Sequence, residues 1–161
     1  MSAFLLSVHV LAAILAIGPV AIAASMFPRY ARLALAAPGD PRTAVAVRIL
    51  HRITRVYAVI GVLVPVFGLA TGASIGVLGD TWLIVSMILT AAAAAVLVAF
   101  ILPGQRRVVG VLDTGVEDAR EVAPDGMARR LGMLTGVFNL LWAIVVVLMI
   151  YRPGSTTGVG L

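Results

Sequence analysis

The chain has 161 residues, of which 61% are hydrophobic and 12% are charged. Its twelve basic residues are all arginine, and together with seven acidic residues they give a formal net charge of +5. This composition excludes a water-soluble globular enzyme, and the absence of cysteine excludes disulfides, thiolate metal sites and cysteine nucleophiles. The arginines flank apolar stretches and do not alternate with aromatic residues, so nucleic-acid binding is not expected.

Four long apolar runs predict the fold. Each run is close to or above the roughly 20 residues that a helix needs to cross a hydrocarbon layer about 30 Å thick. The connections are too short to fold separately, so we expect a single integral membrane domain over residues 1–161. We predict an all-α bundle of four transmembrane helices in two hairpins, with connections over residues 28–55 and 103–130. The predicted spans cover residues 3–27, 56–78, 82–102 and 131–151.

The first span carries His9 about two helical turns from its start. Ala21–Ala23 loosely matches a signal-peptidase site, but no Arg or Lys precedes the run, so a retained first helix is favoured over a cleaved signal peptide. Alanines continue the helical face of His9, which directs the imidazole toward neighbouring helices and away from lipid. A neutral imidazole there can bond to a facing Ser, Thr or carbonyl, or it can ligate haem iron or a metal.

A helix start is predicted in the first connection. Asp40 can cap a helix whose first residue is Pro41, and this helix is expected to run on into the second span. Three arginines follow at spacings i, i+4 and i+7, on one stripe from which their side chains can reach lipid headgroups. His51, beside these arginines, is interpreted as a solvated residue at the membrane surface.

The second span contains a predicted kink at Pro65, where a backbone carbonyl loses its hydrogen-bond partner. Gly68 and Gly72 form a GxxxG pattern, which lets helix backbones approach closely. Packing within the chain is the simpler interpretation of this pattern, and dimerisation is the other. A tight turn over residues 76–80 leads to the third span, where Trp82 is expected to anchor the helix at the membrane surface.

The fourth span repeats the GxxxG pattern at Gly132 and Gly136, with Asn139 on the same face. An amide in hydrocarbon needs a partner, so Asn139 is expected to bond across the bundle as a structural clamp. The methionines could bind copper only if they were clustered, and their spacing in the sequence gives no cluster. No catalytic residue and no metal site are expected.

The arginines predict the orientation. Eleven of the twelve lie in or beside the first and third connections, and only Arg152 lies in the C-terminal tail. Because positive charge stays on the cytoplasmic side, both termini are predicted to be extracytoplasmic. The arginines expected to meet lipid headgroups are Arg48, Arg52, Arg55, Arg106, Arg107, Arg129 and Arg130.

No Asp, Glu or Arg lies in the middle of any predicted span. Proton-coupled transporters need such a group, so this absence argues against an active transporter. No catalytic triad, P-loop or dinucleotide-binding fingerprint is visible. His9 and His51 are expected near opposite faces of the bilayer, which disfavours a site that uses both histidines of one chain.

Short motifs in three spans carry a resemblance. The stretch Val8–Ile14 followed by Gly18, the motif Phe67–Gly72 and the exit Leu148–Pro153 are similar to the DUF2269 family of bacterial integral membrane proteins. That resemblance implies a four-span architecture and no established activity. A looser likeness connects the layout to copper-resistance D and HemJ-type membrane proteins through His9 alone. The chain lacks the tryptophan that commonly follows such a histidine, and it has no lysine.

The expected function follows from small loops and spans built for packing. We expect a non-enzymatic protein of the bacterial inner membrane that contacts the lipid bilayer and self-associates or serves as an accessory to a larger membrane complex. The alternative is a haem- or metal-binding membrane protein that uses His9, with haem b as the cofactor and redox chemistry as a further role. A small-solute permease ranks below both.

Overall fold

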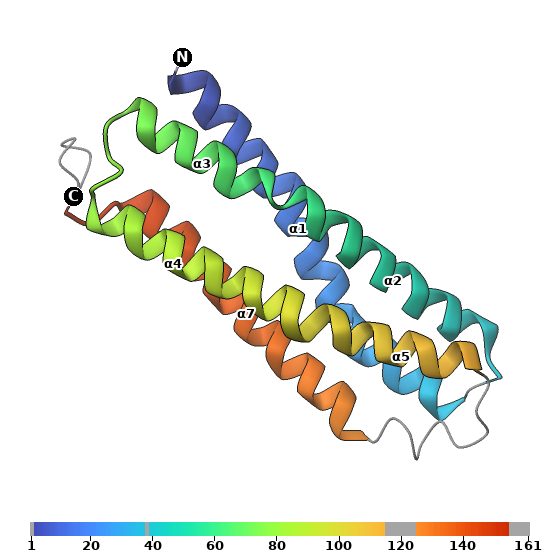
Figure 1. Cartoon of the computed structure of the whole chain (residues 1–161). Coiled ribbons are helices and arrows are strands. Elements are labelled where there is room, and N and C mark those ends of the chain that lie inside the picture. Colours follow the sequence, from blue (N-terminus) through green and yellow to red (C-terminus); the bar gives the residue numbers. More distant parts are fainter. Residues whose placement is uncertain (1, 38, 115–124, 155–161) are drawn as a thin grey trace.

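Four helical rods arranged as two hairpins make up the computed structural model of the chain (Figure 1), which describes residues 2–37, 39–114 and 125–154. The first rod is one helix, the second and third are each interrupted near their middle, and the fourth is again one helix. In chain order the elements are α1 (Ser2–Ala36), α2 (Pro41–Ile60), α3 (Leu63–Ser74), α4 (Thr81–Val96), the π-helical turn η1 (Leu97–Ile101), α5 (Leu102–Thr114) and α7 (Asp125–Tyr151).

The predicted all-α bundle of four spans is confirmed. Within the described residues, four helical rods are long and apolar enough to cross a membrane, so the chain is a multi-pass membrane protein. The rods are longer than the apolar runs: α1 continues to Ala36 and α5 to Thr114. The predicted start at Pro41 is also confirmed, since the Asp40 carboxylate accepts a hydrogen bond from the Arg42 backbone nitrogen at 3.0 Å.

The second rod breaks one turn before Pro65. This proline has no backbone N–H for the Gly61 carbonyl, which instead accepts from the Val64 nitrogen at 3.1 Å, and the helix is interrupted between Ile60 and Leu63. The predicted turn over residues 76–80 is present and contains Gly76 at φ +74°, a backbone conformation that glycine adopts without steric cost.

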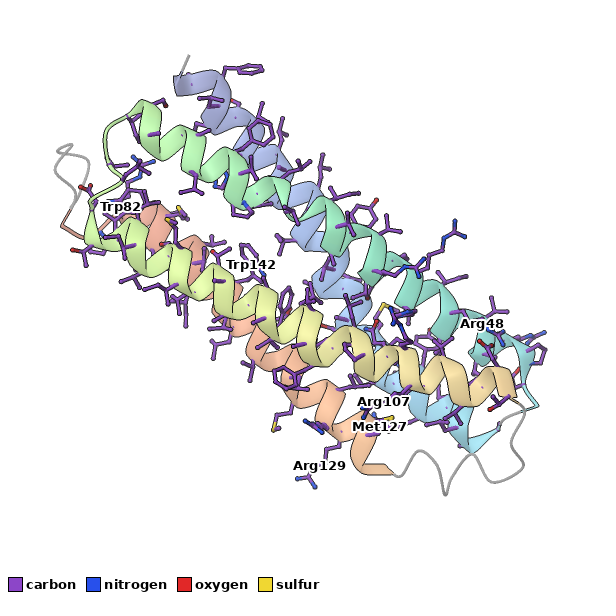
Figure 2. The ribbon with its side chains drawn as sticks, viewed as in Figure 1. Arg48, Trp82, Arg107, Met127, Arg129 and Trp142 are labelled. Atoms are coloured by element: carbon purple, nitrogen blue, oxygen red, sulfur yellow. The ribbon has the colours of Figure 1, made fainter. Side chains whose placement is uncertain are left out.

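Helix α1 is the central element of the bundle. It packs along α2 and α3 in its own hairpin and also along α7 in the other hairpin, where α4 lies beside α7 (Figure 1). The first turn of α1 and the last turn of α7 lie at the same end of the bundle, as an even number of spans requires. We call the half of the bundle nearest this end the terminal half. The other half, where Figure 2 shows Arg48, Arg107 and Arg129, is called the arginine-rich half.

The arginine-rich half is closely packed. Fully buried apolar side chains from four rods meet there, among them Phe27, Val47 and Val108. Farther along, Val20, Ile101 and Phe138 continue the same core toward the middle of the bundle. Packing of apolar side chains therefore joins the two hairpins over the arginine-rich half and the centre of the bundle.

Polar contacts add to this closure between α2 and α5. Gln105 is 1% exposed, its Oε1 accepts from His51 Nδ1 at 3.1 Å, and its Nε2 lies 3.4 Å from the Thr54 hydroxyl. Arg48 of α2 pairs with Asp113, near the end of α5, at 2.7 Å. His51 is therefore half-buried and hydrogen-bonded to a buried amide, which corrects its interpretation as a solvated surface residue.

Candidate functional site

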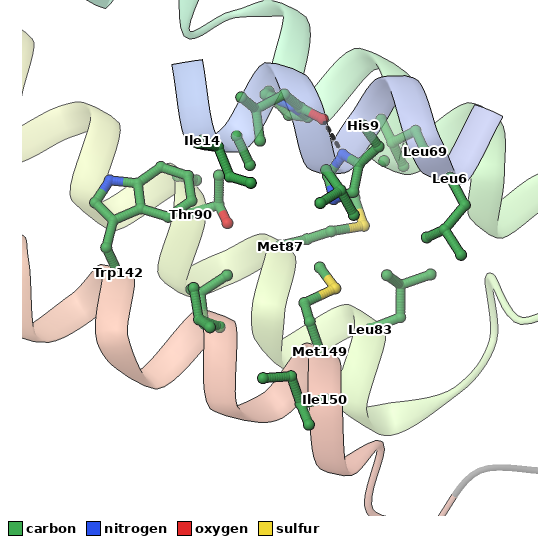
Figure 3. Close-up of a pocket in the computed structure, with 18 of the residues that line it drawn as sticks. Leu6, His9, Ile14, Leu69, Leu83, Met87, Thr90, Trp142, Met149 and Ile150 are labelled. Atoms are coloured by element: carbon green, nitrogen blue, oxygen red, sulfur yellow. Dashed lines mark hydrogen bonds between the residues drawn. The ribbon is translucent and has the colours of Figure 1, made fainter. Parts of the chain in front are cut away.

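A cavity of about 660 Å³ lies in the terminal half of the bundle. Its walls come from α1, α3, α4 and α7, so residues of both hairpins surround it (Figure 3). Most of the lining side chains are aliphatic or thioether groups. The side chains on the wall that carry polar atoms are His9, Thr90, Trp142 and Arg152. This volume and composition are those of sites that bind small molecules, which are largely apolar with a few placed polar groups.

The cavity is open at the side. Ile14 of α1 and Ile150 of α7 both line it, yet their side chains are 64% and 70% exposed. The cavity is therefore open to the outside of the bundle beside these residues, where the exposed side chains are apolar.

His9 presents its imidazole to this cavity in a fixed orientation. Its Nδ1 lies 2.9 Å from the Val64 carbonyl oxygen of α3. A carbonyl can only accept a hydrogen bond, so Nδ1 must carry the proton, and in the neutral ring Nε2 then holds a lone pair. No hydrogen bond to Nε2 is found among the described residues. The bonding alternative predicted for His9, a facing carbonyl, is thus present, and it leaves the second nitrogen available.

Gly68 makes room for the imidazole. A Cβ atom at this position would lie 2.9 Å from His9 Cε1, which is closer than such atoms approach, and 3.2 Å from Nδ1. Gly72 makes room in the same way for Leu78 of the turn and Leu83 of α4. Both glycines of the GxxxG pattern in α3 therefore pack within the chain. One glycine seats the histidine and the other seats the end of α4.

Two methionines lie across the cavity from His9. Met87 of α4 and Met149 of α7 both line the cavity, and Figure 3 shows their side chains reaching into the space beneath the His9 ring. The sequence spacing gave no sign of this arrangement, because three separate rods supply the three side chains. Imidazole and thioether groups together are ligands that suit haem iron and copper(I). No group of three or more His, Cys, Asp or Glu residues that could hold a metal occurs within the described residues.

Trp142 closes the inner end of the cavity. Its ring packs edge-to-face against Phe138 of the central core, with the centroids 6.4 Å apart. Its Nε1 is buried and has no hydrogen-bond partner among the described residues. An unpaired buried donor is uncommon in a folded protein, and here it lies on a side chain of the cavity wall.

Arg152 lies at the rim of the cavity, directly after the last residue of α7. Its Nε donates to the Met149 carbonyl at 3.3 Å, and its guanidinium carbon lies 5.4 Å from the centre of the Trp82 ring. Trp82 is only 4% exposed and donates from Nε1 to Asp80 at 3.0 Å. We predicted that Trp82 anchors the helix at the membrane surface; its side chain is instead buried in the bundle, where it supports Arg152.

The polar clamp predicted at Asn139 is present near the middle of the bundle. Its Nδ2 donates to the Ser25 hydroxyl at 3.0 Å, whereas its Oδ1 is buried without a partner among the described residues. The neighbouring glycines behave differently from those of α3. Gly136 is exposed and a Cβ there would meet nothing within 4 Å, and at Gly132 the nearest atoms, at 3.9 Å, belong to Pro28.

The arginines predicted to reach lipid headgroups are exposed at the arginine-rich end. This group comprises Arg48, Arg52, Arg55, Arg106, Arg107, Arg129 and Arg130. Arg48 differs from the others in its ion pair with Asp113. None of the group lines the cavity.

Comparison of the chain with protein-family models, with curated proteins and with solved structures finds no match in any of the three. The resemblance to the DUF2269 family therefore stays a prediction, and the function must be argued from the cavity and its polar side chains.

Proposed function

We propose that the chain is a non-enzymatic membrane protein that binds an amphiphilic molecule taken sideways from the lipid bilayer. The observation that carries this proposal is the 660 Å³ apolar cavity with an oriented imidazole on its wall. Its volume falls within the roughly 300–1,000 Å³ of small-molecule sites. An unused lone pair on His9 supplies one directed contact, which can accept a hydrogen bond from the ligand.

Filling the cavity tests this proposal. Ala94 lines the cavity, whereas the adjacent Ala95 is exposed on the same helix and does not line it. We expect Ala94→Phe to lose molecules that co-purify with the wild-type protein from mild detergent, measured by mass spectrometry of the extracted protein. Ala95→Phe is the matched control and should retain them. Equal retention by the two variants, or no co-purified molecule in the wild type, would count against a cavity ligand.

Haem is the second candidate ligand, and the state of His9 favours it. Histidines that ligate metals commonly donate their other ring N–H to a carbonyl, which is the arrangement of His9 Nδ1 and Val64. His9 Nε2 would hold the iron, and Met87 or Met149 offers a thioether of the kind that haem iron accepts. Bound haem b would supply one-electron redox chemistry.

An absorbance spectrum distinguishes haem from other ligands. If haem is the ligand, protein purified with haem supplied will show a Soret band that His9→Ala abolishes. Met87→Leu and Met149→Leu would shift the band if a thioether is the second axial ligand. A colourless preparation that takes up no added haemin would remove this candidate and leave the amphiphile proposal in place.

The same proposal includes a location and a mode of association. The arginine distribution supports a bacterial cytoplasmic membrane with both chain ends outside. Gly136 of α7, which is exposed with nothing near its Cβ position, supports self-association, or docking to a larger membrane complex, through the outer face of that helix. Reporter enzymes fused to each end of the chain test the orientation. Activity of a reporter that works only in the cytoplasm, fused to either end, would contradict it.

A further inference from the structure

Arg152 has an uncommon backbone conformation. Its φ of +44° makes it the one non-glycine residue with positive φ among the described residues. The position directly after a helix is usually given to glycine when the chain turns this way, and Gly154 follows only two residues later. Backbone outliers of this kind occur preferentially where a side chain must be held in a particular place.

The side chain of Arg152 is held over the cavity rim. Its Nε–H bonds back to the Met149 carbonyl, and its guanidinium lies over the buried Trp82 ring. Met149 is itself on the cavity wall, so the arginine is fixed to the wall at its base. The terminal N–H groups of the guanidinium form no hydrogen bond with other described residues, which leaves a flat donor edge at the rim.

Polar contacts must decide what the cavity selects. A molecule that leaves the bilayer for an apolar cavity exchanges one hydrocarbon environment for another, so its apolar contacts contribute little discrimination. The selective contacts are then those of His9 and Trp142 inside the cavity and of Arg152 at its rim, the one charged group among them. A guanidinium recognises carboxylates and phosphates through paired, charge-assisted hydrogen bonds.

We infer that the cavity takes single-chain amphiphiles with an anionic head group, a carboxylate or a phosphate monoester, that pairs with Arg152. The hydrocarbon chain of such a molecule occupies the cavity between the two hairpins, past His9. This inference rests on the proposed function, because it names the class of ligand for the same cavity. Arg152 lies at the end of the bundle that holds both termini, so the head group is assigned to that face of the membrane.

The two tryptophans of the chain offer a direct assay, because Trp142 lines the cavity and Trp82 supports Arg152. The protein is placed in nanodiscs of phosphatidylcholine and titrated with a brominated fatty acid, a brominated alkyl phosphate and the brominated alcohol of equal chain length. Quenching of tryptophan fluorescence reports binding. We expect the anions to bind about tenfold more tightly than the alcohol, which is the effect of one charge-assisted hydrogen-bonded pair. The tighter of the two anions identifies the head group.

Substitutions then locate the preference. Arg152→Gln should bring the anions and the alcohol to about the same affinity, whereas Arg152→Lys should keep part of the tenfold preference. Arg130→Gln, an exposed arginine at the other end, is the control and should behave as the wild type. Equal affinity of the wild type for anion and alcohol would overturn this inference but leave the proposed function intact. Absence of quenching by all three probes would overturn both, and a dimer in the same nanodiscs would then point to a second copy as the occupant.

Discussion

Replacing Gly68 by alanine tests whether the imidazole is seated as described. The added Cβ would lie 2.9 Å from His9 Cε1, so the ring must move away from α3. Its hydrogen bond to the Val64 carbonyl is 2.9 Å long and would be stretched or lost. A partly buried polar group left without its partner costs about 1–3 kcal/mol, against which alanine gains about 0.5–1 kcal/mol over glycine in a helix.

Gly136→Ala provides the matched control, because a Cβ at that exposed position meets nothing within 4 Å. It gains the same helix-forming contribution without a clash, so it should equal or slightly exceed the wild type in stability. The two variants should therefore differ by about 1–3 kcal/mol in the free energy of unfolding, with Gly68→Ala the less stable. Unfolding in mixed micelles with increasing sodium dodecyl sulfate measures this difference. If Gly68→Ala proved as stable as Gly136→Ala, the described contact between α3 and His9 would be refuted.

Three further predictions concern other contacts. Gln105→Ala should lower the free energy of unfolding by about 2 kcal/mol in the same denaturation assay, because it empties a buried site and leaves His51 without its acceptor. His51→Ala should lower it by about 1–3 kcal/mol, because it leaves the buried Gln105 oxygen without its donor. Arg48→Met should cost less than about 1 kcal/mol, since both partners of its ion pair are about half exposed, and the cost should fall further as salt is added. Gly136→Ile should weaken self-association in sedimentation equilibrium if copies meet through the outer face of α7. Gly18→Ile, on the other hairpin, is the control and should not, since a Cβ there also meets nothing within 4 Å.

The sequence was sufficient to predict the elements that depend on local chemistry. The apolar runs identified all four spans, Asp40 and Pro41 identified a helix start, and Pro65 identified an interrupted rod. Each of these signals concerns residues that are close together in the chain. The length of the helices was underestimated, because the arginine-bearing flanks are also helical and only their apolar portions were counted.

The cavity could not be predicted, because its wall has the same composition as a lipid-facing surface. Met87 and Met149 look like ordinary membrane residues until α4 and α7 bring them opposite His9. The two GxxxG patterns make the same point, since the one in α3 packs against His9, whereas in α7 Gly136 is exposed with open space around it. Gln105 was missed as well. Its spacing from Val108 and Leu112 on one face of α5 was the available signal that it points inward.

The uneven closure of the bundle has a consequence for ligand entry. The arginine-rich half is tied between α2 and α5 by Gln105 and by the Arg48–Asp113 pair, whereas α3 and α4 scarcely touch in the terminal half. Both of these rods are interrupted between their two halves, one beside Gly61 and the other at the π-helical turn η1. Such interruptions are frequent sites of bending, so the terminal halves can move while the arginine-rich halves stay packed.

Spin labels can measure this motion directly. The chain has no cysteine of its own, so only cysteines introduced by mutation will carry a label. Val66 of α3 and Ile88 of α4 are exposed outside the cavity, and Ile49 of α2 and Arg107 of α5 form the control pair. A bound amphiphile contacts both hairpins, so it should narrow the distance distribution between labels at residues 66 and 88 and leave that between residues 49 and 107 unchanged. Equal changes in both pairs would mean that the hairpins move as rigid rods and that the interruptions at Gly61 and η1 are not hinges.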